Sequence, residues 1–351
     1  MLKIVQFKKI YVGIALALVI ASIASLLIQG FALDTDFAGG TSITYTIEKS
    51  VSENDVKAIV KDTFGKEPSM IRITGKDVDI EVGHDQKLSD KENVDKANAA
   101  VEKLNFEVAK KWGKLSVIVD DEGVELTDGT GKKDEAVTET KKASELTEEQ
   151  IKKQVITVDG YSYFVEGVAK SELNVVSSST ARNLAKSAIV MSLLAALAIL
   201  IYVAFRFDFT SGVCAVVALA HDILVLCGIY SVCRIKIDTN FIAALLTVLG
   251  YSINNTIVVF DRIRENTRRA KKETYAEIAN LSINQTLRRS INTTITTLLT
   301  IGMVYILGVE SIKVFALPII IGIFVGTYSS IFVAGSIWAT WKDASVKSKR
   351  K

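Results

Sequence analysis

The stretch GYSINNTIVVFDRIREN, Gly250 to Asn266, joins an apolar run to a cluster of charges. Its first eleven residues belong to a run long enough to cross a bilayer, yet they include the amides Asn254 and Asn255. It ends in four charged side chains: Asp261, Arg262, Arg264 and Glu265. Polar groups are costly in hydrocarbon unless they are partnered. The stretch therefore predicts a membrane helix with a polar seam packed against other helices, and a charged end at the membrane boundary.

The composition favours a membrane protein with a large polar segment. The chain has 351 residues, 49% of them hydrophobic, and a mean hydropathy of +0.31. Residues 29–183 hold 21 Lys and Arg against 30 Asp and Glu, so the rest of the chain is strongly basic despite a net charge of only +3. The basic residues flank apolar runs and form no single stripe, which argues against nucleic-acid binding.

Six apolar runs are long enough to be membrane spans, since about 20 residues cross the hydrocarbon core. They are Ile10–Ile28, Leu184–Phe205, Gly212–Cys233, Phe241–Phe260, Ile291–Leu307 and Val314–Trp338. Seventeen Lys and Arg flank them on one side and three on the other, so the positive-inside rule predicts cytoplasmic termini. The expected order is a tail and span 1 (1–28), an extracytoplasmic domain (29–183), spans 2–6 (184–340) with a cytoplasmic loop (261–290), and a basic cytoplasmic tail (341–351).

The polar segment predicts an α+β domain. Strand patterns at 42–47, 70–74, 78–82 and 115–119 alternate with two amphipathic helices in the order β-α-β-β-α-β, which is typical of a ferredoxin-like unit. A charged insertion at about 120–153 contains a short helix starting near Thr147, and 161–168 returns to strand character. One decorated unit and two ferredoxin-like units both remain open.

The strongest functional candidates are polar residues inside the predicted spans. His221 and Asp222 lie near the middle of the third span, and a carboxylate at that depth needs a cation, a donor cluster or a proton. A neutral Asp that only fixes packing is the alternative. Asn254 and Asn255 lie in the fourth span and Thr293 in the fifth, while the sixth carries GTYSS, residues 326–330. Serines, threonines and glycines there are expected to serve helix packing.

No enzyme site is predicted. The chain has two histidines and no metal-ligand spacing, so we expect neither a metal nor a cofactor. Asp34 and Asp36 are interpreted as turn residues where the chain leaves the membrane. His84 is expected to be a lone histidine in a solvated loop. The basic residues after Asp261 could meet anionic lipid headgroups or dock a partner.

Five stretches of the chain resemble the SecF family. They are DFAGGT (36–41), ALAHD (218–222), AALLTVLGYSINNTIVVFDRIREN (243–266), SINQTLRRS (282–290) and GTYSSIFVA (326–334). The resemblance implies a resistance-nodulation-division type membrane half that pairs with a SecD-like subunit beside a SecY-type channel in the bacterial cytoplasmic membrane. It implies assistance to the export of unfolded secretory polypeptides, powered by the proton-motive force.

The resemblance also implies roles for individual residues. Polar sites on spans 3–5 would face the SecD-like subunit and carry or gate protons, and Arg289 stands at the position of the family's arginine. The family's Asp is replaced by Asn255, whose amide cannot titrate. The relay would then use carboxylates of the partner with Asp222 and Arg289, or coupling would be altered, for example to Na⁺. The alternatives are a half-transporter for small molecules or lipids, and a non-coupled scaffold of the translocase.

Overall fold

The computed structural model describes residues 4–85, 88–119, 139–158 and 161–349. They form two compact units, each with its own core. The helical unit comprises Met1–Leu33 and Lys186–Lys351, and the α/β unit comprises Asp34–Ala185. Residues 120–138 of the predicted insertion lie outside the described residues.

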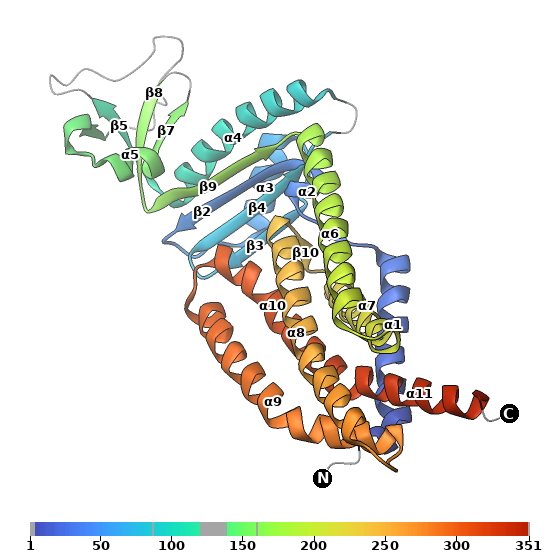
Figure 1. The fold of residues 1–351 in the computed structure, drawn as a ribbon. Helices are drawn as coiled ribbons and strands as arrows, with labels where there is room; N and C mark the ends of the chain where they lie inside the picture. The colour runs from blue at the N-terminus through green and yellow to red at the C-terminus, as the bar shows by residue number, and fades with distance from the viewer. Residues whose placement is uncertain (1–3, 86–87, 120–138, 159–160, 350–351) are drawn as a thin grey trace. The chain divides into compact units, whose positions relative to one another are not determined.

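The helical unit consists of long apolar helices (Figure 1). Six helical segments among the described residues are long and apolar enough to cross a membrane, which confirms the six predicted spans. The elements are η1 (Ile4–Phe7), α1 (Lys8–Gln29), β1 (Ala32–Leu33), α6 (Ser178–Arg206), α7 (Phe209–Val232), β10 (Lys236–Ile237), α8 (Thr239–Arg269), α9 (Tyr275–Leu307), α10 (Glu310–Tyr328), η3 (Ser329–Ala334) and α11 (Gly335–Lys349). The short strands β1 and β10 pair in parallel just outside the helices.

The last span is a helix with an irregular centre. Between α10 and α11 the segment η3 is a π-helix that begins with the two serines of the GTYSS motif. A π-helical turn is rare and is found frequently at functional sites. The wider turn changes the direction in which the following side chains point. The polar serines of this span therefore lie in its irregular part.

The predicted cytoplasmic loop 261–290 is mostly helical, which corrects its expected structure. Helix α8 continues to Arg269 and α9 begins at Tyr275, so five residues join them. Thr274 and Glu277 form a reciprocal capping box at the start of α9. Such a box satisfies two backbone N–H groups that the helix itself leaves unpaired. Ile278 in the first turns of α9 is buried, with 4% of its surface exposed.

Small residues allow the helices to approach closely. A Cβ atom on Gly322 of α10 would lie 2.3 Å from Cγ2 of Val248 on α8. A Cβ atom on Gly228 of α7 would lie 2.0 Å from Oγ of Ser22 on α1. These contacts are backbone-to-side-chain packing of the kind that drives helix association where lipid removes the hydrophobic driving force.

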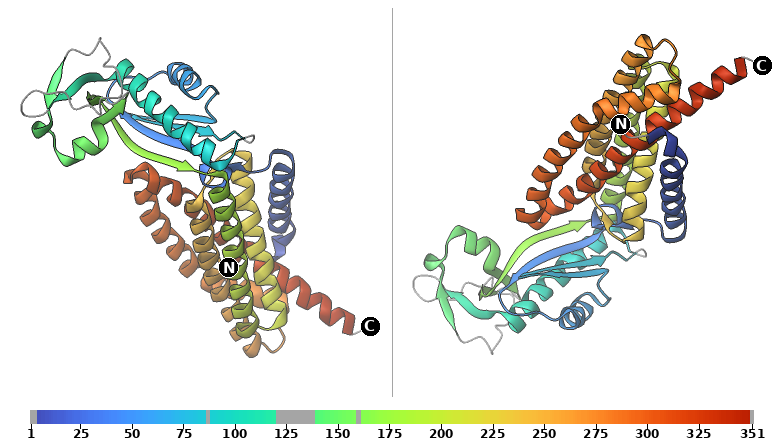
Figure 2. Two further views of the ribbon diagram at one scale, coloured as in Figure 1. Left: turned by 90° about the horizontal axis from the view of Figure 1, so that it is seen from above. Right: turned by 90° about the horizontal axis from the view of Figure 1, so that it is seen from below.

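The α/β unit is built on a four-stranded antiparallel sheet in the order β3-β4-β2-β9. Its strands are β2 (Gly40–Ile47), β3 (Met70–Thr74), β4 (Asp77–Gly83) and β9 (Val168–Val176). Helices α3 (Glu53–Phe64) and α4 (Asp90–Trp112) cover one face of this sheet (Figure 2). Alternate residues of the strands, such as Ile43 and Tyr45 of β2, pack against them as period-2 patterning requires.

A second sheet, in the order β6-β5-β8-β7, corrects the predicted strand assignment. Its elements and their neighbours are β5 (Lys114–Val119), β6 (Thr140–Lys142), η2 (Ala143–Glu145), α5 (Glu148–Gln154), β7 (Val155–Val158) and β8 (Tyr161–Glu166), while α2 (Thr35–Ala38) precedes the first sheet. The strand predicted at 115–119 to close the first sheet lies here, and β9 closes it instead. The helix predicted near Thr147 is α5, with Thr147 as its N-cap.

We predict that Gly322→Ala destabilises the helical unit by about 1–3 kcal/mol, because the new methyl group overlaps Val248 and overpacking costs this much. Val248→Ala in the same chain should restore part of the loss by vacating the space. Thermal unfolding of the purified protein in detergent measures both effects.

The matched control is Gly302→Ala in α9, where no atom lies within 4 Å of the added Cβ. Alanine is the better helix former by about 0.8–1 kcal/mol, so this change should be neutral or stabilising. Equal destabilisation by both substitutions would contradict close packing at Gly322.

Candidate functional site

Asp222 is the most deeply buried charged residue of the helical unit among those described, with 1% of its surface exposed. Its Oδ2 accepts hydrogen bonds from Oγ of Ser252, at 2.5 Å, and from Oγ of Ser329, at 2.8 Å. Its Oδ1 lies 2.9 Å from Nδ1 of His221. One carboxyl group of α7 therefore joins α8 and the π-helical turn η3.

Glycine makes this junction possible. A Cβ atom on Gly326 would lie 3.0 Å from Cβ of Ser252 and 3.5 Å from Oδ2 of Asp222. A side chain at this position would require Ser252 to shift by a few tenths of an ångström, so glycine favours the close approach of the last span to α8. Ser330 then donates to the backbone oxygen of Gly326 at 2.7 Å and lies 2.9 Å from the hydroxyl of Thr256. A second hydroxyl pair thus extends the cluster along α8.

Hydrogen-bond donors, and no cation among the described residues, surround the carboxyl group of Asp222. Within the described residues no Lys or Arg forms an ion pair with Asp222, so its charge is compensated by hydroxyl dipoles and by the adjacent imidazole. A serine hydroxyl can donate to a carboxylate or turn to accept from a carboxylic acid. Both forms of Asp222 can therefore be hydrogen-bonded in one arrangement of the backbone.

Two buried nitrogen atoms near this cluster have no hydrogen-bond partner among the described residues. They are Nε2 of His221 and Nδ2 of Asn255, which lies one turn after Ser252 on α8. Buried polar atoms without partners are uncommon, and they call for an explanation such as an unseen water, an ion or a functional rearrangement. They identify the region around α7 and α8 as polar space that the side chains alone do not satisfy.

The structure separates the predicted polar residues into two groups. His221, Asp222 and Asn255 are buried, whereas Asn254 and Arg289 are exposed on the helical unit. Thr293 is half-buried and donates to the backbone oxygen of Arg289 in its own helix at 2.9 Å. The expectation that Asp222 faces a partner subunit is therefore wrong: its carboxyl group is enclosed by serines of its own chain.

Sequence reasoning assigned these serines to helix packing and missed their contact with Asp222. The available signal was the GTYSS motif, because two adjacent serines in a span are unusual enough to need partners. A second polar contact was also missed: Thr294 of α9 lies 2.9 Å from the hydroxyl of Thr327 on α10. Tyr251 of α8 donates to Thr294 at 3.3 Å, so α8, α9 and α10 share this contact.

The charged end of α8 ties three helices together. Asp261 forms an ion pair with Arg206 at the end of α6. Arg262 donates to Oε1 of Gln285 on α9 at 2.6 Å and pairs with Glu265 at 2.5 Å. The amide of Asn266 donates to Ser282 and to Gln285, both at 2.8 Å. Arg264 is exposed. The charged end of α8 therefore holds this helix against α6 and α9.

We predict that Ser252→Ala lowers the stability of the helical unit by about 1–2 kcal/mol, because the buried carboxyl group of Asp222 loses a donor. The same change should cost less in an Asp222→Asn background, where the acceptor carries no charge. Unfolding of the four proteins of this cycle in mixed micelles measures the coupling between the two side chains.

Thr296→Ala serves as the control, since that exposed hydroxyl donates only to backbone oxygens of its own helix. An equal loss for Ser252→Ala with and without Asp222→Asn would assign Ser252 to packing alone.

Comparisons with known proteins agree with this arrangement. The family model described as protein export membrane protein SecD/SecF, C-terminal, matches residues 160–344. The SecF subunit of Sebaldella termitidis is 30% identical over 337 residues, which cover 96% of this chain and 90% of that protein. The SecDF subunit of Thermus thermophilus is 47% identical over 168 residues, covering 48% of this chain and 23% of that protein.

Solved structures give the same result. A crystal structure of SecDF from Thermus thermophilus, described as a translocon-associated membrane protein, matches with a TM-score of 0.70 and 30% identity. A second, in a super-membrane-facing form, matches with a TM-score of 0.59 and 29% identity. These matches cover 97% and 99% of this chain and 38% and 39% of those chains. The chain spans about a quarter of the length of the SecDF relatives named among the curated proteins.

The matched regions include α7, α8, η3 and the polar cluster between them. The chain belongs to the SecF family of protein translocase subunits.

Proposed function

We propose that this chain is the SecF-type half of a complex that helps unfolded polypeptides cross the bacterial cytoplasmic membrane, powered by the proton-motive force. Its partner would be a SecD-like subunit, and the two would work beside a SecY-type channel. Support comes from the relatives named SecDF, in which a segment similar to this chain makes up about a quarter of one polypeptide. The remaining part of such a machine would be a SecD-like partner.

The observation that carries the proposal is the position of Asp222 between three helical elements. Its carboxyl group holds Ser252 of α8 and Ser329 of η3 with one oxygen atom. Protonation removes the charge that these two donors compensate, and it weakens charge-assisted hydrogen bonds to ordinary ones. A proton arriving at Asp222 therefore changes how strongly α7 holds α8 and the last span, which is a physical link between a proton and helix packing.

The energy that one proton gains from the membrane potential is large enough to change the hydrogen bonds at Asp222. Each elementary charge that crosses a potential of 100 mV supplies about 2.3 kcal/mol. Single hydrogen bonds to charged groups contribute about 1.5–3 kcal/mol. One proton can thus offset the loss of about one of the two hydroxyl contacts at Asp222.

We propose that the α/β unit is an extracytoplasmic domain of the ferredoxin-like type and that both termini are cytoplasmic. The first sheet supports the domain type, since β2, α3, β3, β4, α4 and β9 follow the order β-α-β-β-α-β. The second sheet would be an insertion between α4 and β9. The distribution of Lys and Arg supports the orientation through the positive-inside rule.

Exposed polar residues of the helical unit support a partner surface. Asn254, in the fourth predicted span, is exposed where lipid would disfavour an amide, and Arg289 is exposed just before the fifth predicted span. We propose that the SecD-like subunit covers them and supplies the carboxylate that Asn255 cannot provide. In this arrangement the proton relay would use a carboxylate of the partner together with Asp222 and Arg289.

A non-coupled scaffold is the second candidate function. It is favoured by one observation, the amide at Asn255, which cannot titrate and whose buried nitrogen has no partner among the described residues. Amide and hydroxyl oxygens also suit Na⁺, a hard cation, so a sodium-driven variant of the machine belongs to the same test.

We predict that Asp222→Asn reduces the gradient-dependent part of polypeptide export by about tenfold or more, since tenfold corresponds to only 1.4 kcal/mol. The measurement is export into inverted membrane vesicles that contain the complete complex, under an imposed proton gradient and separately under a sodium gradient. Asp343→Asn, outside the polar cluster on α11, is the control and should leave export unchanged.

Unchanged export by the Asp222→Asn complex would favour the scaffold. If export responded to the sodium gradient and not to the proton gradient, the complex would be coupled to sodium instead of protons.

A further inference from the structure

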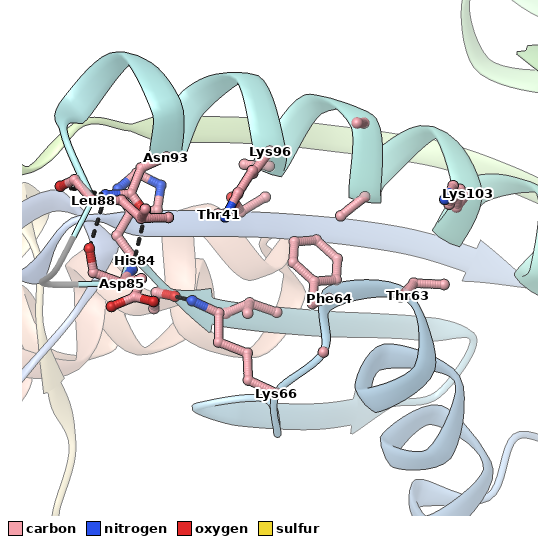
Figure 3. A pocket seen from close by; sticks show the side chains of 16 residues that line it. Thr41, Thr63, Phe64, Lys66, His84, Asp85, Leu88, Asn93, Lys96 and Lys103 are labelled. Carbon is pink, nitrogen blue, oxygen red and sulfur yellow. Dashed lines mark hydrogen bonds between the residues drawn. The ribbon is translucent and has the colours of Figure 1, made fainter.

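The α/β unit contains a pocket that the export proposal does not use. Its volume is about 400 Å³, within the range of about 300–1,000 Å³ that is typical of small-molecule sites. Helix α4 bounds it on one side and the loop after α3 on the other, with β2 and the end of β4 between them (Figure 3). All of these elements belong to one unit and share its core.

Unpartnered polar atoms face this pocket. The hydroxyl of Thr41 on β2 is buried and has no hydrogen-bond partner among the described residues, in a residue with 1% of its surface exposed. Within the same described part of the chain, both ring nitrogens of His84 are also buried without partners. The expectation that His84 is a solvated-loop histidine is therefore wrong. Leaving such groups unsatisfied costs about 1–3 kcal/mol each, and a ligand that bonds to them recovers that cost.

Positive charge predominates around the same space. Three lysines line the pocket, Lys66, Lys96 and Lys103, against one aspartate, Asp85. The ammonium group of Lys66 donates to the backbone oxygen of Gly83. Neither Lys96 nor Lys103 forms a salt bridge within the described residues of the α/β unit. The pocket therefore has more cationic than anionic groups and attracts an anion.

The titration of two lining groups agrees with this charge. Burial, reinforced by the nearby Lys96, holds the pKa of Lys66 below its ordinary value even though Asp85 acts in the opposite direction. Burial and the charge of Lys66 likewise lower the pKa of His84, against the influence of Asp90. His84 is consequently neutral near pH 7, where one ring nitrogen donates and the other accepts. An anion in the pocket would relieve the repulsion between the cations.

Part of the wall is apolar. Phe64, Val82, Leu88, Ala97 and Ala100 line it beside the polar groups. The lining residues include lysines but no arginine fork that would match several phosphate oxygens. Two carboxylate oxygens suit the hydroxyl of Thr41 and the ammonium group of Lys96, and a short apolar body suits the remaining wall.

We propose that this pocket is a binding site for an organic carboxylate with a short apolar body. The carboxylate would lie between Thr41, His84 and Lys96, and the apolar body against Phe64 and the alanines of α4. A free organic acid and the acidic side chain of a polypeptide both present this chemistry. The site would give the α/β unit a ligand of its own, independent of the ion that drives the helical unit.

The test uses the full chain in lipid nanodiscs and calorimetric titration with 4-phenylbutyrate and its neutral amide, with empty nanodiscs as the blank. The acid should bind one to one, and the amide about tenfold or more weakly, because a hydrogen bond to a charged group contributes about 1.5–3 kcal/mol. Equal binding of acid and amide, or no binding of the acid, would overturn the proposal. Displacement of the acid by equimolar inorganic phosphate would overturn the assignment to a carboxylate.

The peptides N-acetyl-Phe-Glu-amide and N-acetyl-Phe-Gln-amide distinguish the two sources of the carboxylate. Preference for the Glu peptide over the Gln peptide, together with competition against 4-phenylbutyrate, would identify polypeptide as a ligand. Binding of the free acid alone would identify a small molecule. The measurement needs no ion gradient, so its outcome is independent of the export proposal.

Two variants test the residues. Lys96→Gln and Thr41→Val should each weaken binding of the acid about three- to tenfold and leave the amide unaffected. Lys91→Gln is the matched control, because Lys91 is an exposed lysine of the same helix that does not line the pocket. Lys96 is also exposed, so its variant still decides the question if Thr41→Val does not fold. If Lys96→Gln and Lys91→Gln weakened binding equally, general surface charge would explain the attraction, and the proposed site would be contradicted.

Discussion

The helical unit depends on how one buried carboxyl group is accommodated. Moving an unpaired carboxylate into a low-dielectric interior is far more costly than a folded protein can sustain. Asp222 is held there by donors from α8 and η3 and by the imidazole beside it. Because those donors come from separate spans, the cost of burying one group is met only when three helical elements are assembled. The same requirement makes their assembly sensitive to the charge of Asp222.

Close backbone packing is the condition for that arrangement. Gly322 and Gly326 bring the last span against α8, and the π-helical turn then directs Ser329 towards Asp222 and Ser330 towards Thr256. A regular helix with larger residues at these positions would hold the serines away from the carboxyl group. The hydrogen bonds of the two serines therefore depend on the close packing at the two glycines.

The α/β unit is stabilised by a different interaction. Its core is ordinary burial of alternating strand residues under two amphipathic helices. The pocket beside α4 differs from this apolar core, because a buried hydroxyl, a neutral imidazole and several ammonium groups surround its open space. Groups of this kind are retained at a cost in stability, which is the physical reason for attributing a ligand to them.

The sequence by itself determined the six spans, the α+β character of the polar segment and the presence of a carboxyl group, Asp222, within the third span. Runs of about 20 apolar residues, period-2 and period-3.6 patterns and a mid-span carboxylate are local properties that are visible in one dimension. It did not determine which strand closes the first sheet, because 115–119 and 168–176 are both good strands and only the chain's path after α4 chooses between them.

Only the tertiary structure decided which polar residues meet. Asn254 and Asn255 are adjacent in sequence, yet one is exposed and the other buried, since successive residues of a helix point about 100° apart. Ser329 lies 107 residues from Asp222, and His84 lies 43 residues after Thr41, so no local pattern could join them. Contacts between distant segments depend on helix rotation, close approach and the π-helical turn, and these are set by packing in three dimensions.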